Sequence, residues 1–301
     1  LDYGIGARVQ EVSSNATLSN NNSTFYNTTR YPDDGSSVKA LFAYGQINFL
    51  INKQLDLLIG GRWNNSELLA KYNNPTFNFS DVKNNNVSFV KSGLISFNAT
   101  KSTTINFAYY SGFRNPNIDD LGKIFSKDNI HVVIPNPNLE PEYANNSELS
   151  ISYTAGQLRI QIQVFNTQIS NAINREYGTF NGIDSMLYDG QMMRVQMNKN
   201  IERAHINGID LVTTFNVNNN LSITARCNYL KGETHEKRPL SHIPPFSSKI
   251  SFNYQLKQRI FNLYTNYNDW KLAENYDDSG VDNLDESTRD GNPSWYTLNF
   301  E

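Results

Sequence analysis

The chain has 301 residues, with 26 basic and 29 acidic side chains and a net charge of -3, so its composition predicts no basic surface for nucleic acid. A single cysteine, Cys227, excludes a disulfide framework or a cysteine-based metal site within the chain. No apolar run approaches the about 20 residues that a membrane-spanning helix needs, and no signal peptide opens the sequence. The hydrophobic fraction of 38% suits a soluble globule, and it equally suits a β-barrel in which only alternate residues face lipid.

Short and long connections alternate along the chain. Short turns are expected at Ile51–Gln54, Thr100–Thr103, Ala155–Gln157, Val217–Asn220 and Gln255–Gln258. Longer polar connections are expected at Ser13–Ser37, Tyr72–Asn85, Arg114–Glu142, Asn174–Arg194, Glu233–His242 and Glu274–Asn292. Short turns on one rim and long loops on the other are typical of a transmembrane antiparallel β-barrel.

The segments between these connections alternate apolar and polar residues, as strands with one apolar face do. In one segment, Leu158, Ile160, Ile162 and Val164 alternate with Arg159, Gln161 and Gln163. Several segments exceed ten residues, which suits the about 9–11 residues of a tilted membrane strand: Val38–Leu50, Leu55–Leu69, Val87–Asn98 and Arg203–Val217. Arg159, Arg226 and Lys249 lie deep within strands, and their charges favour a wet barrel lumen over a dry core.

About twelve strands are expected. The chain starts in a strand at Leu1, and Trp295–Glu301 enters another one. We therefore expect residues 1–301 to be one barrel domain that is a fragment of a longer protein.

Five motifs resemble those of TonB-dependent outer-membrane receptors of the Bacteroidetes type. Two are paired boxes, Phe113-Arg114-Asn115-Pro116 and Asn136-Pro137-Asn138-Leu139-Glu140-Pro141-Glu142. The others are the strand Asn200–Asp210, the strand entry Arg238–Pro245 and the strand start Asn292–Asn299. Their order and spacing agree with the family from about Val38 to the end of the chain.

This resemblance implies a 22-stranded barrel around a plug domain, of which the chain would hold roughly strands nine to twenty, without the plug. It implies an outer-membrane receptor of a Gram-negative bacterium that imports a scarce, large nutrient with energy from TonB. Its partners would be the nutrient, TonB, outer-membrane lipid and, where one caps the barrel, a surface lipoprotein. No nucleophile and base occur at a characteristic spacing, so no catalytic residues are expected. Neither a resident cofactor nor a bound metal is expected.

The segment between the two boxes contains His131, and haem receptors of the family carry an iron-ligating histidine there. Imidazole is an axial ligand of haem iron. Asn115 departs from the haem-receptor box, which usually has alanine at this position, so ferric siderophores and other large ligands stay open. His235 lies in a polar loop and is a second candidate ligand residue. Arg114 is a third candidate, although an inward, structural role that satisfies carbonyls and carboxylates of loops or plug is favoured for it.

Two other classes of function compete with energised import. A passive pore or adhesive barrel would have the same wall without a plug. A soluble all-β carbohydrate-binding module would turn its apolar faces to a core.

Overall fold

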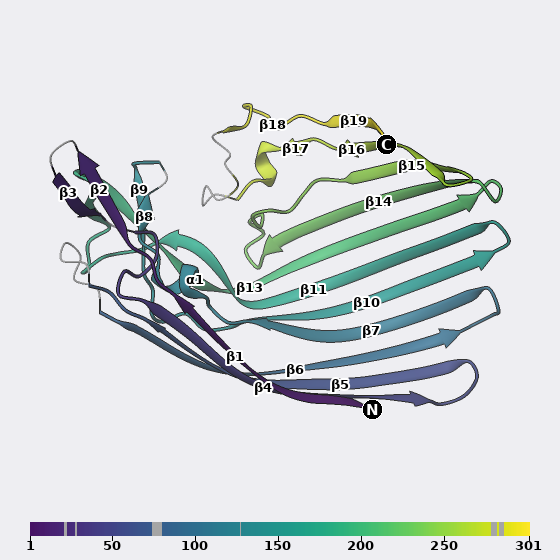
Figure 1. Ribbon diagram of the computed structural model, residues 1–301, viewed down its shortest axis with the longest axis horizontal. Helices are drawn as coiled ribbons and strands as arrows, with labels where there is room; N and C mark the ends of the chain where they lie inside the picture. Colours follow the sequence, from purple (N-terminus) through teal and green to yellow (C-terminus); the bar gives the residue numbers. More distant parts are fainter. Residues whose placement is uncertain (21–22, 28, 74–79, 127, 278–281, 283–285) are drawn as a thin grey trace.

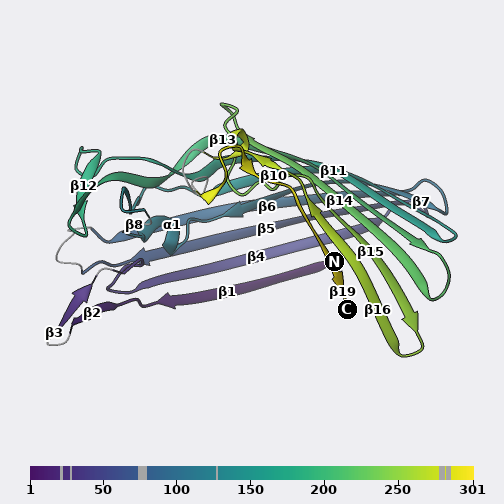
Figure 2. The same ribbon diagram turned by 90° about the horizontal axis from the view of Figure 1, so that it is seen from above.

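The computed structural model describes residues 1–301 except 21–22, 28, 74–79, 127, 278–281 and 283–285. Its main feature is a sheet of 15 strands among the described residues. The main antiparallel path holds twelve of them in the order β1-β4-β5-β6-β7-β10-β11-β13-β14-β15-β16-β19. Their bounds are β1 (Asp2–Val12), β4 (Ser36–Leu50), β5 (Leu55–Ala70), β6 (Val82–Asn98), β7 (Thr103–Arg114), β10 (Glu142–Ala155), β11 (Leu158–Tyr177), β13 (Gln191–Asn216), β14 (Leu221–Thr234), β15 (Ser247–Leu256), β16 (Arg259–Asn268) and β19 (Trp295–Phe300). The sheet curves into a deep trough (Figures 1 and 2).

The five predicted short turns all lie at one end of the sheet (Figure 1). Gly156 in the turn between β10 and β11 has a φ of 56°, a left-handed conformation that glycine adopts without strain. The opposite end carries the long connections. Their short elements are β2 (Ala16–Asn20), β3 (Ser23–Asn27), α1 (Ile118–Gly122), β8 (Phe125–Ser126), β9 (His131–Ile134), β12 (Ser185–Tyr188), β17 (Lys271–Leu272), η1 (Ala273–Asn275) and β18 (Gly291–Asn292). Within the described ranges, no helix is long and apolar enough to cross a membrane.

Two of the long connections differ in extent from the predicted ones. The predicted connection Asn174–Arg194 is shorter, because β13 gains an antiparallel partner in β12 and a parallel partner in β9. The predicted connection Glu233–His242 is longer, because Pro244 and Pro245 lack the N–H groups of a strand ladder and delay β15 to Ser247. Parts of the predicted connections Ser13–Ser37, Tyr72–Asn85, Arg114–Glu142 and Glu274–Asn292 lie outside the described residues.

The convex face of the sheet carries a continuous apolar row. Cross-strand partners in this row are Phe107, Leu149, Val164, Ile209 and Tyr229, from β7 to β14. Each is between 39% and 49% exposed, so no other part of the described chain covers them. A one-residue slip would turn every one of them to the other face, so this row fixes the register. An uncovered apolar row of this kind is the lipid-facing surface of a membrane barrel.

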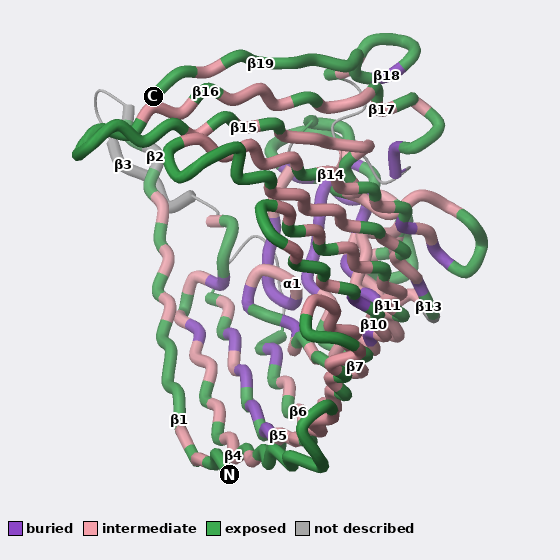
Figure 3. The backbone as a smooth tube through the Cα atoms, turned by 90° about the vertical axis from the view of Figure 1, so that its right-hand side faces the viewer, coloured by how far each residue is buried: buried purple, intermediate pink, exposed green. Residues whose placement is uncertain are grey.

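The buried residues, drawn in purple in Figure 3, gather toward the long connections. One cluster packs α1 against β5 and β6 and consists of Leu68, Ala70, Val82, Ile118, Leu121 and Leu139. The other cluster joins β9, β12 and β13 and consists of Ile124, Val132, Ile134, Met186, Tyr188, Met193 and Val195. The core of the described chain therefore anchors the long connections, and most of the wall lacks a second protein layer.

Candidate functional site

The first predicted box ends β7 and starts the segment 115–141, which folds back into the trough. Asn117 caps α1, because its side chain accepts the backbone N–H of Asp120 while the Asp120 carboxylate accepts the N–H of Asn117. Arg114 pairs with Asp120 and with Glu142, the first residue of β10. One guanidinium thus ties together the end of β7, the start of α1 and the start of β10.

The second box fastens the return of this segment to the wall. The Asn136 amide donates to the carbonyl of Asn198 on β13 at 2.7 Å, and the Asn198 amide donates to the carbonyl of Asp120 at 3.0 Å. Leu139 is 2% exposed, and its carbonyl accepts the amide of Asn84 on β6 at 2.9 Å. Pro116 of the first box is buried, whereas Pro137 and Asn138 are exposed. Most of the box residues therefore position the segment.

His131 begins β9 inside the trough, where it lies opposite Arg194 of β13. Its side chain is 26% exposed. Nδ1 lies 2.6 Å from a carboxylate oxygen of Asp128, and the other oxygen accepts the backbone N–H groups of Ile130 and His131. Burial acts to raise the pKa of Asp128, but these hydrogen bonds, led by that from the His131 ring, lower it to about 2. The carboxylate is therefore ionised and orients the imidazole.

The second ring nitrogen of His131 is weakly engaged. Nε2 lies 3.5 Å from the Tyr177 hydroxyl, which is longer than a strong hydrogen bond. Arg194 stacks on the ring of Tyr177, with its guanidinium carbon 3.9 Å from the ring centroid. Histidines that bind metals commonly hold one nitrogen on a carboxylate and present the other to the metal. The arrangement of Asp128, His131 and Tyr177 has this form.

Sequence reasoning found His131 but not Asp128, Tyr177 or Arg194. Asp128 could have been found as a carboxylate three residues before a histidine, which is a weak signal. Tyr177 and Arg194 reach His131 only because β9 pairs with β13. Among the described residues, no three His, Cys, Asp or Glu side chains form a group that could hold a metal.

The structure does not bring His235 to His131. The backbone N–H of His235 donates to the carbonyl of Arg203, nine residues along β13 from Arg194, a separation of about 30 Å on an extended strand. His235 lines an outward cavity with His205 and Arg203. His131 and His235 therefore belong to different surfaces.

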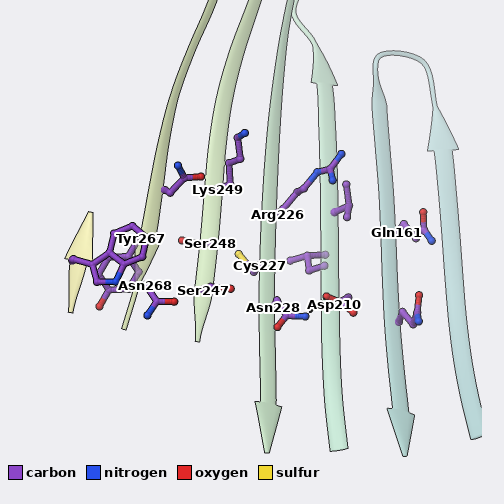
Figure 4. Close-up of a pocket in the computed structure, with 15 residues that line it drawn as sticks. Gln161, Asp210, Arg226, Cys227, Asn228, Ser247, Ser248, Lys249, Tyr267 and Asn268 are labelled. Atoms are coloured by element: carbon purple, nitrogen blue, oxygen red, sulfur yellow. Dashed lines mark hydrogen bonds between the residues drawn. The ribbon is translucent and has the colours of Figure 1, made fainter. Parts of the chain in front are cut away.

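The three predicted lumen residues lie on the concave face. Arg226 and Lys249 are direct cross-strand partners and line a cavity of about 520 Å³ with Asp210 and Asn228 (Figure 4). The Lys249 ammonium is 3.9 Å from the ring centroid of Tyr264. Arg159 faces Thr214 further toward the short turns. The concave face toward the short turns is therefore polar and carries three basic side chains.

Comparison with known proteins defines the family. The model of the family "TonB dependent receptor-like, beta-barrel" matches residues 1–301. The chain belongs to the TonB-dependent receptor β-barrel family. Proteins of this family are transport receptors that form outer-membrane β-barrels in Gram-negative bacteria. The predicted family membership and the predicted antiparallel barrel wall are thereby confirmed, while the Bacteroidetes type stays a prediction.

This TonB-dependent receptor chain is similar to several known proteins. It is 26% identical over 198 residues to "Probable hemoglobin and hemoglobin-haptoglobin-binding protein 4" of Haemophilus influenzae, covering 59% of this chain and 20% of that protein. Among solved structures, the copper transporter OprC matches 99% of this chain and 44% of its own, with 14% identity and a TM-score of 0.73. The ferric yersiniabactin receptor FyuA of Yersinia pestis matches 99% and 42%, with 14% identity and a TM-score of 0.65.

The ferric enterobactin receptor PfeA of Pseudomonas aeruginosa matches 99% of this chain and 50% of its own, with 13% identity and a TM-score of 0.64. The chain thus spans half or less of the length of these relatives. The solved structures share its fold.

Proposed function

We propose that this receptor imports an iron complex across the outer membrane, with energy supplied through TonB. The observation that carries the proposal is the family model's match to all 301 residues. The convex apolar row supports a position in the membrane, and the polar concave face supports a wet lumen. We propose that residues 1–301 form one barrel domain, with Arg159, Arg226 and Lys249 lining its interior.

We propose haem as the iron complex and His131 as the residue that binds its iron. The relative from Haemophilus influenzae is named for binding haemoglobin, which carries haem. Asp128 holds Nδ1, so Nε2 is left to ligate iron once the long contact with Tyr177 opens. Arg194 supplies a cation beside Tyr177, which suits the carboxylates of haem. Arg114 acts indirectly, because it fixes the segment that carries His131.

The test is a haemin titration of the purified receptor, followed by its Soret absorbance. The parent should give a saturable Soret shift. His131→Ala should lower the affinity for haemin at least about tenfold, since one ligand bond is lost. His235→Ala is the matched control, because this histidine lies on another surface, and it should titrate like the parent. Asp128→Asn should weaken binding less than His131→Ala does.

Equal titration of the parent and His131→Ala would overturn the role of His131. A parent that binds no haemin would remove haem and leave iron import through a siderophore complex as the proposal.

A further inference from the structure

On the convex face, the apolar row is followed toward the long connections by a row of mostly polar residues, two positions further along each strand. The next row of cross-strand partners is Tyr109, Ser147, Asn166, Asn207 and Lys231. The row beyond it is Ser111, Asn145, Gln168, His205 and Glu233. Because alternate residues of a strand share a face, these side chains point to the same side as the apolar row. The change marks where the wall leaves the hydrocarbon and meets lipid headgroups.

A cavity of about 550 Å³ opens on this outward polar surface. Seven polar side chains from β10, β11, β13 and the residue after β14 line it: Asn145, Asn166, Gln168, Ser170, Arg203, His205 and His235. Arg203 and His235 are exposed. We call this cavity the outer pocket.

The anionic side chain beside the outer pocket is already engaged. Glu233 pairs with Lys231 at 2.9 Å and with His205 at 3.2 Å. Two of the amides also have partners, since Asn166 donates to Asn207 at 2.7 Å and Asn145 accepts the Tyr109 hydroxyl at 3.1 Å. Within the described residues, no ion pair engages Arg203 or His235. The outer pocket therefore presents a guanidinium, an imidazole and an amide to an acceptor from outside the chain.

We propose that the outer pocket binds the phosphate of a lipid headgroup in the membrane leaflet on the long-loop side. A guanidinium binds phosphate through two parallel hydrogen bonds, and Arg203 supplies one. Acyl chains of the same lipid would lie along the adjacent apolar row, from Val164 and Ile209 toward the short turns. A pocket that begins where this row ends fits a molecule with a phosphate head and an apolar tail.

The test measures lipid retained by the detergent-purified receptor, using native mass spectrometry. The probes are lipid A, a diphosphorylated glycolipid, and the same lipid after phosphate removal. The parent should retain lipid A and not the dephosphorylated form. The double variant Arg203→Gln/His235→Gln should retain at least about tenfold less, because the guanidinium and the imidazole donors are both lost. Lys101→Gln, an exposed substitution in the short turn after β6, is the matched control and should behave like the parent.

Equal retention by the parent and the double variant would overturn the proposal, as would equal retention of the two lipids. Displacement of lipid A by millimolar inorganic phosphate would also overturn it, since the pocket would then serve a soluble anion. The single variant His235→Gln, which lies beyond the end of β14, guards against misfolding of the double variant and should show a smaller loss. The haemin titration should be unchanged in all these variants, so failure of this proposal is distinguishable from failure of haem import.

Discussion

His131 illustrates how one carboxylate can prepare a side chain for a ligand. Asp128 is held by three hydrogen bonds, two of them from backbone N–H groups, so it has little freedom to turn away. It fixes the imidazole plane and leaves Nε2 toward Tyr177. The local chain therefore fixes the geometry before any ligand arrives, which reduces the entropy lost on binding.

The titration of Asp128 tests this arrangement. The pKa of Asp128 in the folded receptor is about 2, below its ordinary 3.8. The ionised carboxylate therefore contributes stability to the fold fully above about pH 3.8, and this contribution is lost as the pH falls through about 2. Carbon-13 NMR of the labelled Asp128 carboxyl in the folded receptor should show a midpoint near 2. Asp128→Asn removes the signal and serves as its assignment. A midpoint near 3.8 would show that the contacts with His131 and Ile130 do not persist.

Arg114→Gln should loosen the segment 115–141. The change removes two ion pairs, but the arginine side chain is 44% exposed, so solvent screening limits the loss to about 1–2 kcal/mol. Limited proteolysis should cut the segment several times faster in the variant. Arg159→Gln is the control. It removes a cation from the same concave face, and Arg159 forms no ion pair with the described residues. Identical cleavage of Arg114→Gln and the parent would refute the anchoring role of Arg114.

At the scale of elements, the segment between β7 and β10 depends on one buried leucine. Leu139 packs with Leu121 of α1 and with Leu68 and Val82 of the wall. Leu139→Ala should cost about 2–5 kcal/mol of local stability, because the cavity cannot collapse against a rigid sheet. Hydrogen exchange of the Asn136 and Asn198 neighbourhoods should accelerate. Leu149→Ala on the convex face should leave that exchange unchanged, and equal effects of the two variants would contradict the packing.

Because β11 has an apolar and a polar face, the same substitution should have different effects on stability at two neighbouring residues. Ile162 lies on the convex face between Ile151 and Leu211, and Gln163 lies on the concave face opposite Asp210. Ile162→Arg should cost about 2–4 kcal/mol near the bilayer midplane, whereas Gln163→Arg should be tolerated in a wet lumen. Urea unfolding of the receptor from lipid vesicles measures both. A larger loss for Gln163→Arg would mean that the faces are reversed.

At the scale of the whole molecule, the wall could be predicted because its signals are local. Alternation along Leu158–Val164 identifies a strand face, and the turn at Gly156 identifies where the chain reverses. The interior could not be predicted in the same way. Tyr177 meets His131 from 46 residues away, and this contact depends on the parallel pairing of β9 with β13. Such contacts depend on which long connection folds into the trough, which no local pattern records.

The most direct measurement of the central claim is uptake of iron from haem by cells that carry the full-length receptor, with and without TonB. Energised import predicts that iron-starved cells accumulate haem iron only when both the receptor and TonB are present, and that His131→Ala reduces uptake. Uptake that persists at the same rate without TonB would contradict this account and identify the barrel as a passive pore.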